Sequence, residues 1–205
     1  MVKQTFEQNT DGRDKKEDIE WIRIWCEDTG SDLPRVAMIG DSITEQVYEK
    51  VKKELQGLVK VDYLATSYSI ASPTYMKMVQ AFADDSQYAL IYFNYGLHAG
   101  GLPIEVYEDG CRTILSRLMK KARVVIGSTT TLHGETYAKS LPMVEQRNAC
   151  IVRLADELAL PIDDGYAISV ELGADAKTDG VHFNEAGIER LAKHKAEWIK
   201  KLIKE

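Results

Sequence analysis

A serine lies where a buried apolar run meets a helix-like pattern. Residues 36–44 are Val-Ala-Met-Ile-Gly-Asp-Ser-Ile-Thr, so Ser42 comes just after the apolar run. At the start of a helix, unpaired backbone N–H groups favour negative charge beside such a hydroxyl. A serine that attacks a carbonyl carbon needs this setting, because the attack creates an oxyanion. The alternative is a plain strand-to-helix turn in which Asp41 or Ser42 caps the helix.

A carboxylate and an imidazole lie three residues apart near the C-terminus. Residues 178–184 are Thr-Asp-Gly-Val-His-Phe-Asn, so one turn can bring Asp179 to one ring nitrogen of His182. The other ring nitrogen can then accept a proton from a serine. Asn184 can cap the helix predicted after it and so hold this loop in place. Taken alone, the pair is better explained as a polar turn before a helix, with no catalytic role.

The two motifs together resemble those of the SGNH hydrolases, also called the GDSL esterase/lipase family. The resemblance spans roughly residue 34 to the end of the chain. It implies Ser42 as nucleophile, His182 as general base and acid, and Asp179 as the carboxylate that orients the imidazole. The Gly-x-Ser-x-Gly elbow of the α/β-hydrolases is a different motif, and the sequence lacks it.

After the third predicted strand, the chain departs from the usual pattern of this family. Most members carry Gly-x-Asn-Asp, and the Asn side chain donates to the oxyanion, whereas this chain has Gly96-Leu97-His98-Ala99. The chain therefore resembles a sub-branch in which His98 takes the place of the asparagine. An imidazole N–H can donate as an amide does. Asn94 is a second candidate donor, or else a side chain that ties down the loop.

The second backbone donor of the family's oxyanion hole follows the second strand and is a glycine. Residues 63–70 are Tyr-Leu-Ala-Thr-Ser-Tyr-Ser-Ile, with no glycine among them. Because a backbone N–H does not require glycine, we expect Ser67 or Ser69 to supply this donor.

Apolar runs alternate with helix-like patterns along the chain. Strands are predicted at 35–39, 59–64, 89–93, 123–126 and 160–162, and helices at 45–55, 103–120, 142–158 and 185–203. This alternation predicts an α/β protein with a parallel sheet covered on both faces. With the family resemblance, we expect a flavodoxin-like three-layer α/β/α sandwich with five parallel strands in the order 2-1-3-4-5. The first and third strands are then neighbours, which places Ser42 beside His98.

A length of 205 residues suits one domain with a sizeable core. We expect residues 1–14 to be disordered and residues 15–205 to form a single domain. Ile19, Ile22, Trp25 and Cys26 fall at helical spacing and predict a helix before the first strand.

Charge and composition argue against several classes of function and indicate where the protein is located. A net charge of −6 without a basic block outside the last helix argues against nucleic-acid binding. The N-terminal residues lack an apolar h-region, so we expect neither a signal peptide nor a membrane anchor. Three widely spaced cysteines without a Cys-x-x-Cys pair indicate reduced thiols and a cytoplasmic location.

The other histidines, aspartates and arginines give no sign of a metal or cofactor site. His98, His133, His182 and His194 show no i, i+4 pair and no cysteine partner at ligand spacing, so we expect no metal site. Asp163 and Asp164, after the last strand, are expected to form a turn. Arg147 and Arg153 are expected on a helix surface.

The sequence thus predicts a serine esterase that works through a Ser42 acyl-enzyme on a small-molecule or carbohydrate ester. Acetyl groups on sugars are the substrate that the family resemblance suggests. One alternative is a carbohydrate- or metabolite-binding protein that has lost turnover, which the altered asparagine position favours. Another is an acyltransferase that uses the same three residues. The sequence leaves the oligomeric state open.

Overall fold

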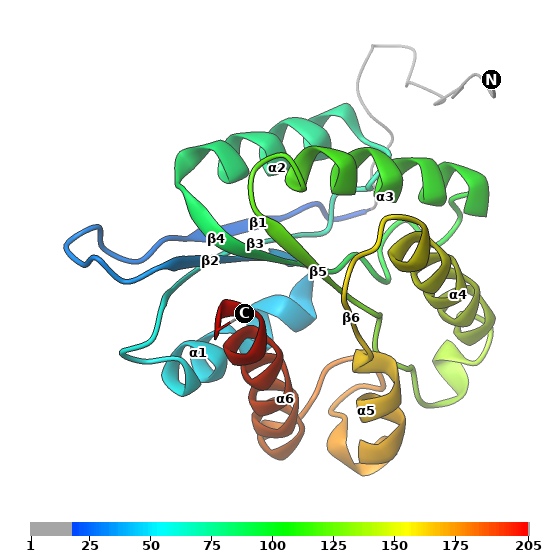
Figure 1. Ribbon diagram of the computed structural model, residues 1–205. Coiled ribbons are helices and arrows are strands. Elements are labelled where there is room, and N and C mark those ends of the chain that lie inside the picture. The colour runs from blue at the N-terminus through cyan, green and yellow to red at the C-terminus, as the bar shows by residue number, and fades with distance from the viewer. Residues whose placement is uncertain (1–17, 205) are drawn as a thin grey trace.

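The computed structural model describes residues 18–204, which are built around a six-stranded sheet (Figure 1). The strands are β1 (Ile22–Trp25), β2 (Arg35–Gly40), β3 (Lys60–Thr66), β4 (Tyr88–Phe93), β5 (Arg123–Gly127) and β6 (Ile162–Asp163). They lie in the order β1-β3-β2-β4-β5-β6. The last five are parallel and have the predicted order, whereas β1 runs antiparallel to β3 and adds an edge strand.

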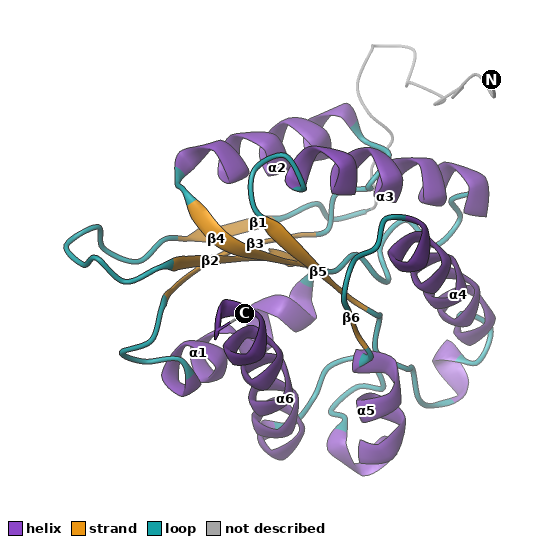
Figure 2. Cartoon of the chain, viewed as in Figure 1, coloured by secondary structure: helices purple, strands orange, loops and turns teal. Residues whose placement is uncertain are grey.

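Helices cover both faces of the sheet and give the predicted three layers (Figure 2). They are α1 (Ser42–Glu54), α2 (Pro73–Asp85), α3 (Ile104–Leu118), α4 (Leu141–Glu157), α5 (Gly165–Leu172) and α6 (Glu185–Lys204). Apolar side chains of α2, α3 and α4 pack on one face of the sheet, and those of α1 and α6 pack on the other. The alternating side chains of β2 divide between the two cores, with Ile39 in one and Met38 in the other.

Two of these helices, α2 and α5, were not predicted. The start of α2 does carry a sequence signal, because Ser72 caps the amides of Thr74 and Tyr75 and Pro73 occupies the first turn. Helix α5 spans only eight residues, too few for its hydrophobic periodicity to stand out.

The helix predicted around Ile19–Cys26 is wrong, because residues 22–25 form strand β1. Ile22 lies opposite Thr66 and Trp25 lies opposite Tyr63 in an antiparallel ladder. Isoleucine and tryptophan favour strands over helices, but a run this short fits either period, and the helical spacing of its apolar residues was misleading. The ladder with β3 decides for a strand, since it pairs the backbone groups of both segments. The predicted disorder of residues 1–14 lies outside the described residues.

Helix α6 is fixed to the sheet by a buried polar network. Asp163, which was expected to form a turn, is fully buried and forms hydrogen bonds with Tyr92 (2.5 Å) and His194. The Lys195 Nζ donates to the hydroxyl of Tyr92 (2.6 Å). Burial opposes the ionisation of Asp163, but His194, Lys195 and Tyr92 hold its pKa below the usual range. The network fixes the helix that follows the Asp179–His182 loop. Asp164, in contrast, caps α5 by accepting from the amide of Ala167.

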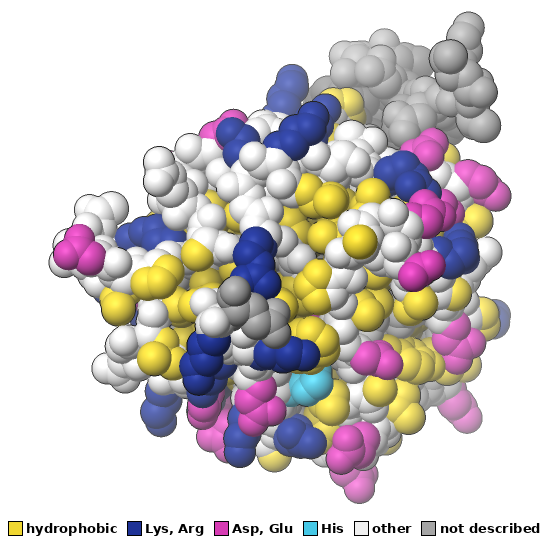
Figure 3. Space-filling model, viewed as in Figure 1, with side chains coloured by type: hydrophobic (Ala, Val, Ile, Leu, Met, Phe, Trp, Pro, Cys, Tyr) yellow, Lys and Arg dark blue, Asp and Glu magenta, His cyan; other side chains and the backbone are white. Residues whose placement is uncertain are grey.

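The surface carries charges of both signs. On the face shown in Figure 3, Lys and Arg side chains gather near the C-terminal end of α6 with Asp and Glu side chains beside them. Cations at this end of a helix interact favourably with the partial negative charge of its dipole.

Among the described residues, no helix combines the length and apolar character needed to span a membrane.

Candidate active site

Ser42, His182 and Asp179 form one continuous chain of hydrogen bonds. The Oγ of Ser42 lies 2.9 Å from Nε2 of His182, and Nδ1 of the same ring lies 2.7 Å from Oδ2 of Asp179. Ser42 and His182 are 140 residues apart in the sequence. The structure therefore brings the two predicted motifs together with the geometry of a nucleophile, a base and an orienting carboxylate.

The carboxylate of Asp179 is fixed within its own turn. Its Oδ1 accepts from the backbone N–H groups of Val181 (2.9 Å) and His182 (2.7 Å), while Oδ2 faces the ring. Burial acts against the charged form, but the bonds from His182 and Val181 lower the pKa of Asp179 to about 2. Asp179 is therefore ionised at neutral pH, and it favours the tautomer of His182 that has a proton on Nδ1 and a lone pair facing Ser42.

The Asp179–His182 loop is anchored on both sides. Gln46 of α1 accepts from the amide of Phe183 (3.2 Å), which ties the loop to the helix that carries Ser42. The amide of His133 donates to the carbonyl of Gly180 (2.9 Å). Gly180 has φ +85°, and a Cβ there would lie 2.2 Å from the carbonyl oxygen of His133, so this approach requires glycine. As predicted, Asn184 caps α6, where it accepts from the amide of Gly187 (3.1 Å).

Lys177 is a further anchor that the sequence analysis missed. Its Nζ donates to the carbonyls of Val181 (2.7 Å) and Thr131 (3.1 Å) and lies 3.5 Å from the centroid of the Phe183 ring. Burial lowers the pKa of Lys177 to about 7, although Asp179 acts to raise it. Lys177 thus joins the loop to the chain after β5. No local pattern marks it, because both its hydrogen-bond acceptors are backbone carbonyls.

Ser42 is the first residue of α1, and Asp41 is the N-cap. The side chain of Asp41 accepts from the amide of Ile43 (3.0 Å), and its carbonyl accepts from Glu45 (3.1 Å). These capping bonds do not use the backbone N–H of Ser42. Gly40 permits the tight turn, since a Cβ there would lie 2.0 Å from Oγ1 of Thr44. Ser42 therefore lies at a helix N-terminus, where both the backbone N–H groups and the helix dipole favour an oxyanion.

The loop that carries His98 passes beside the start of α1. A Cβ on Gly96 would lie 2.6 Å from Cγ2 of Thr129 and 3.2 Å from Oδ2 of Asp41, so only glycine fits in this space. The guanidinium of Arg147 donates to the carbonyls of Gly96 (2.6 Å), His98 (2.8 Å) and Ala99 (2.6 Å). Ala99 itself has φ +55°, a left-handed conformation that is costly for alanine.

The predicted surface position of Arg147 is wrong, because its side chain is 1% exposed. It lies under the His98 loop, with its guanidinium carbon 4.7 Å from the centroid of the Tyr107 ring. A buried arginine needs several acceptors, and the three carbonyls of the loop supply them. Arg153, six residues later on α4, is exposed and pairs with Glu108. Helical spacing was the signal that the sequence analysis overlooked, because Arg147 lies three residues after Val144 and four before Ile151, on the buried face of α4.

Trp21 contacts His98 of the same loop. Its ring meets that of His98 edge-on, with centroids 6.2 Å apart and an interplanar angle of 79°. Trp21 pairs with Ser67 at the end of β3, whereas His98 follows β4, and β2 lies between these strands. The contact therefore spans the end of β2, which is where Ser42 begins α1.

Two of the predicted oxyanion donors have other partners. The amide nitrogen of Asn94 donates to the carbonyl of Gly127 (2.8 Å), so this side chain ties β4 to β5. The backbone N–H of Ser67 donates to the carbonyl of Trp21 (3.2 Å), which corrects its assignment to the oxyanion hole. Ser69 uses its carbonyl and hydroxyl in the turn before α2, where they accept from Ser72 and Ala71. These bonds leave the backbone N–H of Ser69 as the candidate from this segment.

Within residues 18–204, no cluster of three or more His, Cys, Asp or Glu side chains has the arrangement of a metal site.

Comparison with known proteins identifies this fold. No family model and no curated protein matches the sequence. A member of the lipolytic G-D-S-L family from Veillonella parvula has a similar structure, with a TM-score of 0.68, 17% identity, and coverage of 82% of this chain and 98% of that one.

Two further solved structures agree. The lipase/acylhydrolase from Enterococcus faecalis has a TM-score of 0.70 at 16% identity, with coverage of 82% of this chain and 96% of that one. A catalytic mutant of Axe2, an acetylxylan esterase from Geobacillus stearothermophilus, has a TM-score of 0.68 at 14% identity, with 82% and 94% covered. The chain described here therefore has the fold of the SGNH, or GDSL, hydrolases.

Proposed function

We propose that this protein is a serine esterase that acts through an acyl-enzyme on Ser42. The observation that carries the proposal is the chain of hydrogen bonds from Asp179 through His182 to Ser42. It stands at a helix N-terminus, in a fold shared with esterases. A polar turn without a catalytic role would not need the imidazole to join a carboxylate to a hydroxyl from a distant segment.

The reaction follows from this geometry. Nε2 of His182 takes the proton of Ser42 as Oγ bonds to the ester carbonyl carbon. The tetrahedral intermediate collapses when His182 protonates the departing alcohol, which leaves the acyl group on Oγ. His182 then deprotonates a water molecule, whose oxygen attacks the acyl carbon. The acid leaves, and the proton returns to Ser42.

Three groups support the developing oxyanion in this proposal. The backbone N–H of Ser42 lies at the positive end of α1, and His98 contributes a side-chain donor from the neighbouring loop. Ser69 is the candidate for the remaining backbone donor. Because the site residues supply a base, an acid and hydrogen-bond donors, the proposed chemistry calls for no metal or cofactor.

We infer that the substrate is an ester of a small acyl group, such as an acetylated carbohydrate. The inference rests on the fold shared with an acetylxylan esterase. It is tested by comparing kcat/KM for p-nitrophenyl esters of acetate, butyrate and octanoate, and then for acetylated xylooligosaccharides. A preference for octanoate would overturn it. Alcohols added to the assay distinguish hydrolysis from acyl transfer to an alcohol. An acyltransferase would form a new ester with the added alcohol, whereas an esterase would release the free acid.

The decisive experiment for the mechanism is the intact mass after treatment with a fluorophosphonate. We expect one adduct on the wild type and none on Ser42→Ala or His182→Ala. Ser116→Ala, which removes an exposed hydroxyl from α3, is the matched control and should label normally. A folded wild-type protein without an adduct would refute the activated serine and favour a binding protein that keeps the fold without turnover.

A further inference from the structure

Strand β1 forms an open edge of the sheet, because it pairs with β3 on one side and with no other described strand on the other. In an antiparallel ladder, the backbone groups of successive residues point alternately toward and away from the partner strand. The N–H of Ser67 donates to the carbonyl of Trp21, which lies opposite it in the register that pairs Ile22 with Thr66, so the backbone groups of the odd-numbered residues face β3. The N–H and C=O groups of Ile22, Ile24 and Cys26 therefore point outward.

The side chains of this edge are unusually apolar. Of the eight large hydrophobic side chains exposed within residues 18–204, four lie between residues 19 and 25. They are Ile19 (75% exposed), Ile22 (37%), Ile24 (51%) and Trp25 (55%). Soluble proteins normally protect edge strands with charges, bulges or proline, because an apolar edge pairs readily with another strand. Here Arg23 is the only charge within β1, and its side chain pairs with Glu45.

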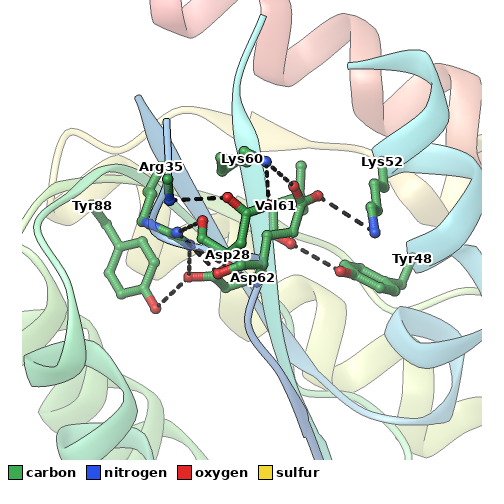
Figure 4. Close-up of polar contacts among 10 residues, drawn as sticks. Asp28, Arg35, Tyr48, Lys52, Lys60, Val61, Asp62 and Tyr88 are labelled. Carbon is green, nitrogen blue, oxygen red and sulfur yellow. Dashed lines mark hydrogen bonds and ion pairs between the residues drawn. The ribbon is translucent and has the colours of Figure 1, made fainter. Parts of the chain in front are cut away.

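The edge is also held firmly at both ends. At its start, Ser67 and Thr66 bind the backbone of Trp21. Beyond its end, the fully buried Asp62 accepts from the amide of Glu27 (2.8 Å) and from Arg35 (2.8 and 2.9 Å), as Figure 4 shows for the arginine. A strand fixed in this way pays little conformational entropy when another strand adds to it.

We propose that β1 pairs antiparallel with β1 of a second copy of this chain, centred on Ile24. The same patch then meets itself about a two-fold axis, as in most homodimers. Charge selects this register. Centring on Ile24 places Arg23 opposite Trp25 of the second copy, where a guanidinium can lie over the indole. Centring on Arg23 would place the two arginines directly opposite each other, and like charges there are unfavourable.

The remaining register is also less favourable. A pairing centred on Ile22 would leave Trp25 outside the paired residues and set Ile24 against Glu20.

The sequence of the neighbouring segment favours a second copy as the strand that pairs with β1. The chain segment just before the described part is a poor strand former, since residues 11–17 are Asp-Gly-Arg-Asp-Lys-Lys-Glu. The pairing joins the two sheets into one, with the carboxyl ends of their parallel strands at opposite edges. Each copy keeps its own site, so this proposal does not depend on the proposed function.

The first test is the mass in solution, measured by light scattering after size exclusion across a dilution series. We expect the full-length wild type to have the mass of a dimer and Ile24→Lys to have half of it. Val152→Lys, at a side chain 54% exposed on α4, is the matched control and should remain dimeric. A wild type that is monomeric throughout, or a dimer that survives Ile24→Lys, would overturn the proposal. Fluorophosphonate labelling of Ile24→Lys should be unchanged.

The register is tested by cross-linking in a Cys26→Ser background. A hydrogen-bonded antiparallel pair has its Cα atoms about 5.5 Å apart, which a disulfide can span. Ile24→Cys should therefore form a covalent dimer on mild oxidation. Arg23→Cys should not, because the two copies of residue 23 would lie on a diagonal, about 7–8 Å apart. The opposite result would refute the Ile24-centred pairing.

Discussion

The indole of Trp21 lies edge-on to the imidazole of His98, with the two ring centroids 6.2 Å apart. One residue precedes the edge strand and the other follows β4, so their contact spans the end of β2, the strand that leads to Ser42. A ring edge packed on an imidazole restricts its rotation. Trp21 is thus in a position to orient the side chain that replaces the family's asparagine.

This contact predicts a graded loss of activity. Removal of an oxyanion donor costs about 100- to 1000-fold in kcat, so we expect His98→Ala to lose at least about 100-fold. Trp21→Ala should lose about 10-fold, since the donor remains but is less well oriented, and Trp21→Phe should retain most activity. The measurement is kcat and KM on p-nitrophenyl acetate. Unchanged kcat in His98→Ala would remove His98 from the oxyanion hole.

Asp179→Asn should reduce kcat by about 1000- to 10,000-fold while the protein stays folded. The Asn side chain can take the place of the carboxylate, but it no longer favours the tautomer of His182 that accepts the proton of Ser42. Asp175→Asn, at an exposed acid before the same loop, is the matched control and should have normal kcat. Equal activity in both variants would contradict the role of Asp179.

Arg147→Met should destabilise the protein by about 2–4 kcal/mol, because three loop carbonyls lose a charged donor. Arg153→Met, on the surface of the same helix, should cost less than about 0.5 kcal/mol. Urea denaturation followed by circular dichroism gives both free energies of unfolding. Similar values for the two variants would show that the bonds of Arg147 contribute no more than a surface ion pair.

Lys177 predicts a stability that changes with pH. Burial lowers its pKa from 10.5 in the unfolded chain to about 7 in the folded protein, against the influence of Asp179. Below pH 7 both states hold the proton, so the cost of burying the charge is fully present. Between pH 7 and 10.5 the unfolded chain binds more protons than the folded protein, so the contribution of Lys177 to stability rises with pH.

The difference in unfolding free energy between wild type and Lys177→Met should therefore shift in favour of the wild type as pH rises from 7 to 10. Urea denaturation at several pH values measures this difference. Lys193→Met, at an exposed lysine of α6, is the control for the loss of a lysine side chain as such. A difference for Lys177→Met that does not change with pH would disprove the lowered pKa.

Local sequence determined a large part of this protein. The five parallel strands follow from apolar runs that alternate with helical patterns, and their order is the one that the resemblance to the SGNH hydrolases implies. The cap at Asp41, the position of Ser42 at the helix start and the Asp179–His182 turn all depend on residues at most a few positions apart. Local chemistry therefore predicts them, because each is formed by a single turn or a single strand–helix junction.

Only the tertiary structure decided which distant groups meet. Ser42 reaches His182 because β2 and the loop before α6 end at the same edge of the sheet. Arg147 is buried because the His98 loop offers it three carbonyls. Ser67 is unavailable to the oxyanion because its N–H donates to the carbonyl of Trp21, just before β1. Backbone carbonyls and amides carry no sequence identity, so no motif marks the side chains that bind them. For the same reason, residues 22–25 became a strand only through their ladder with β3.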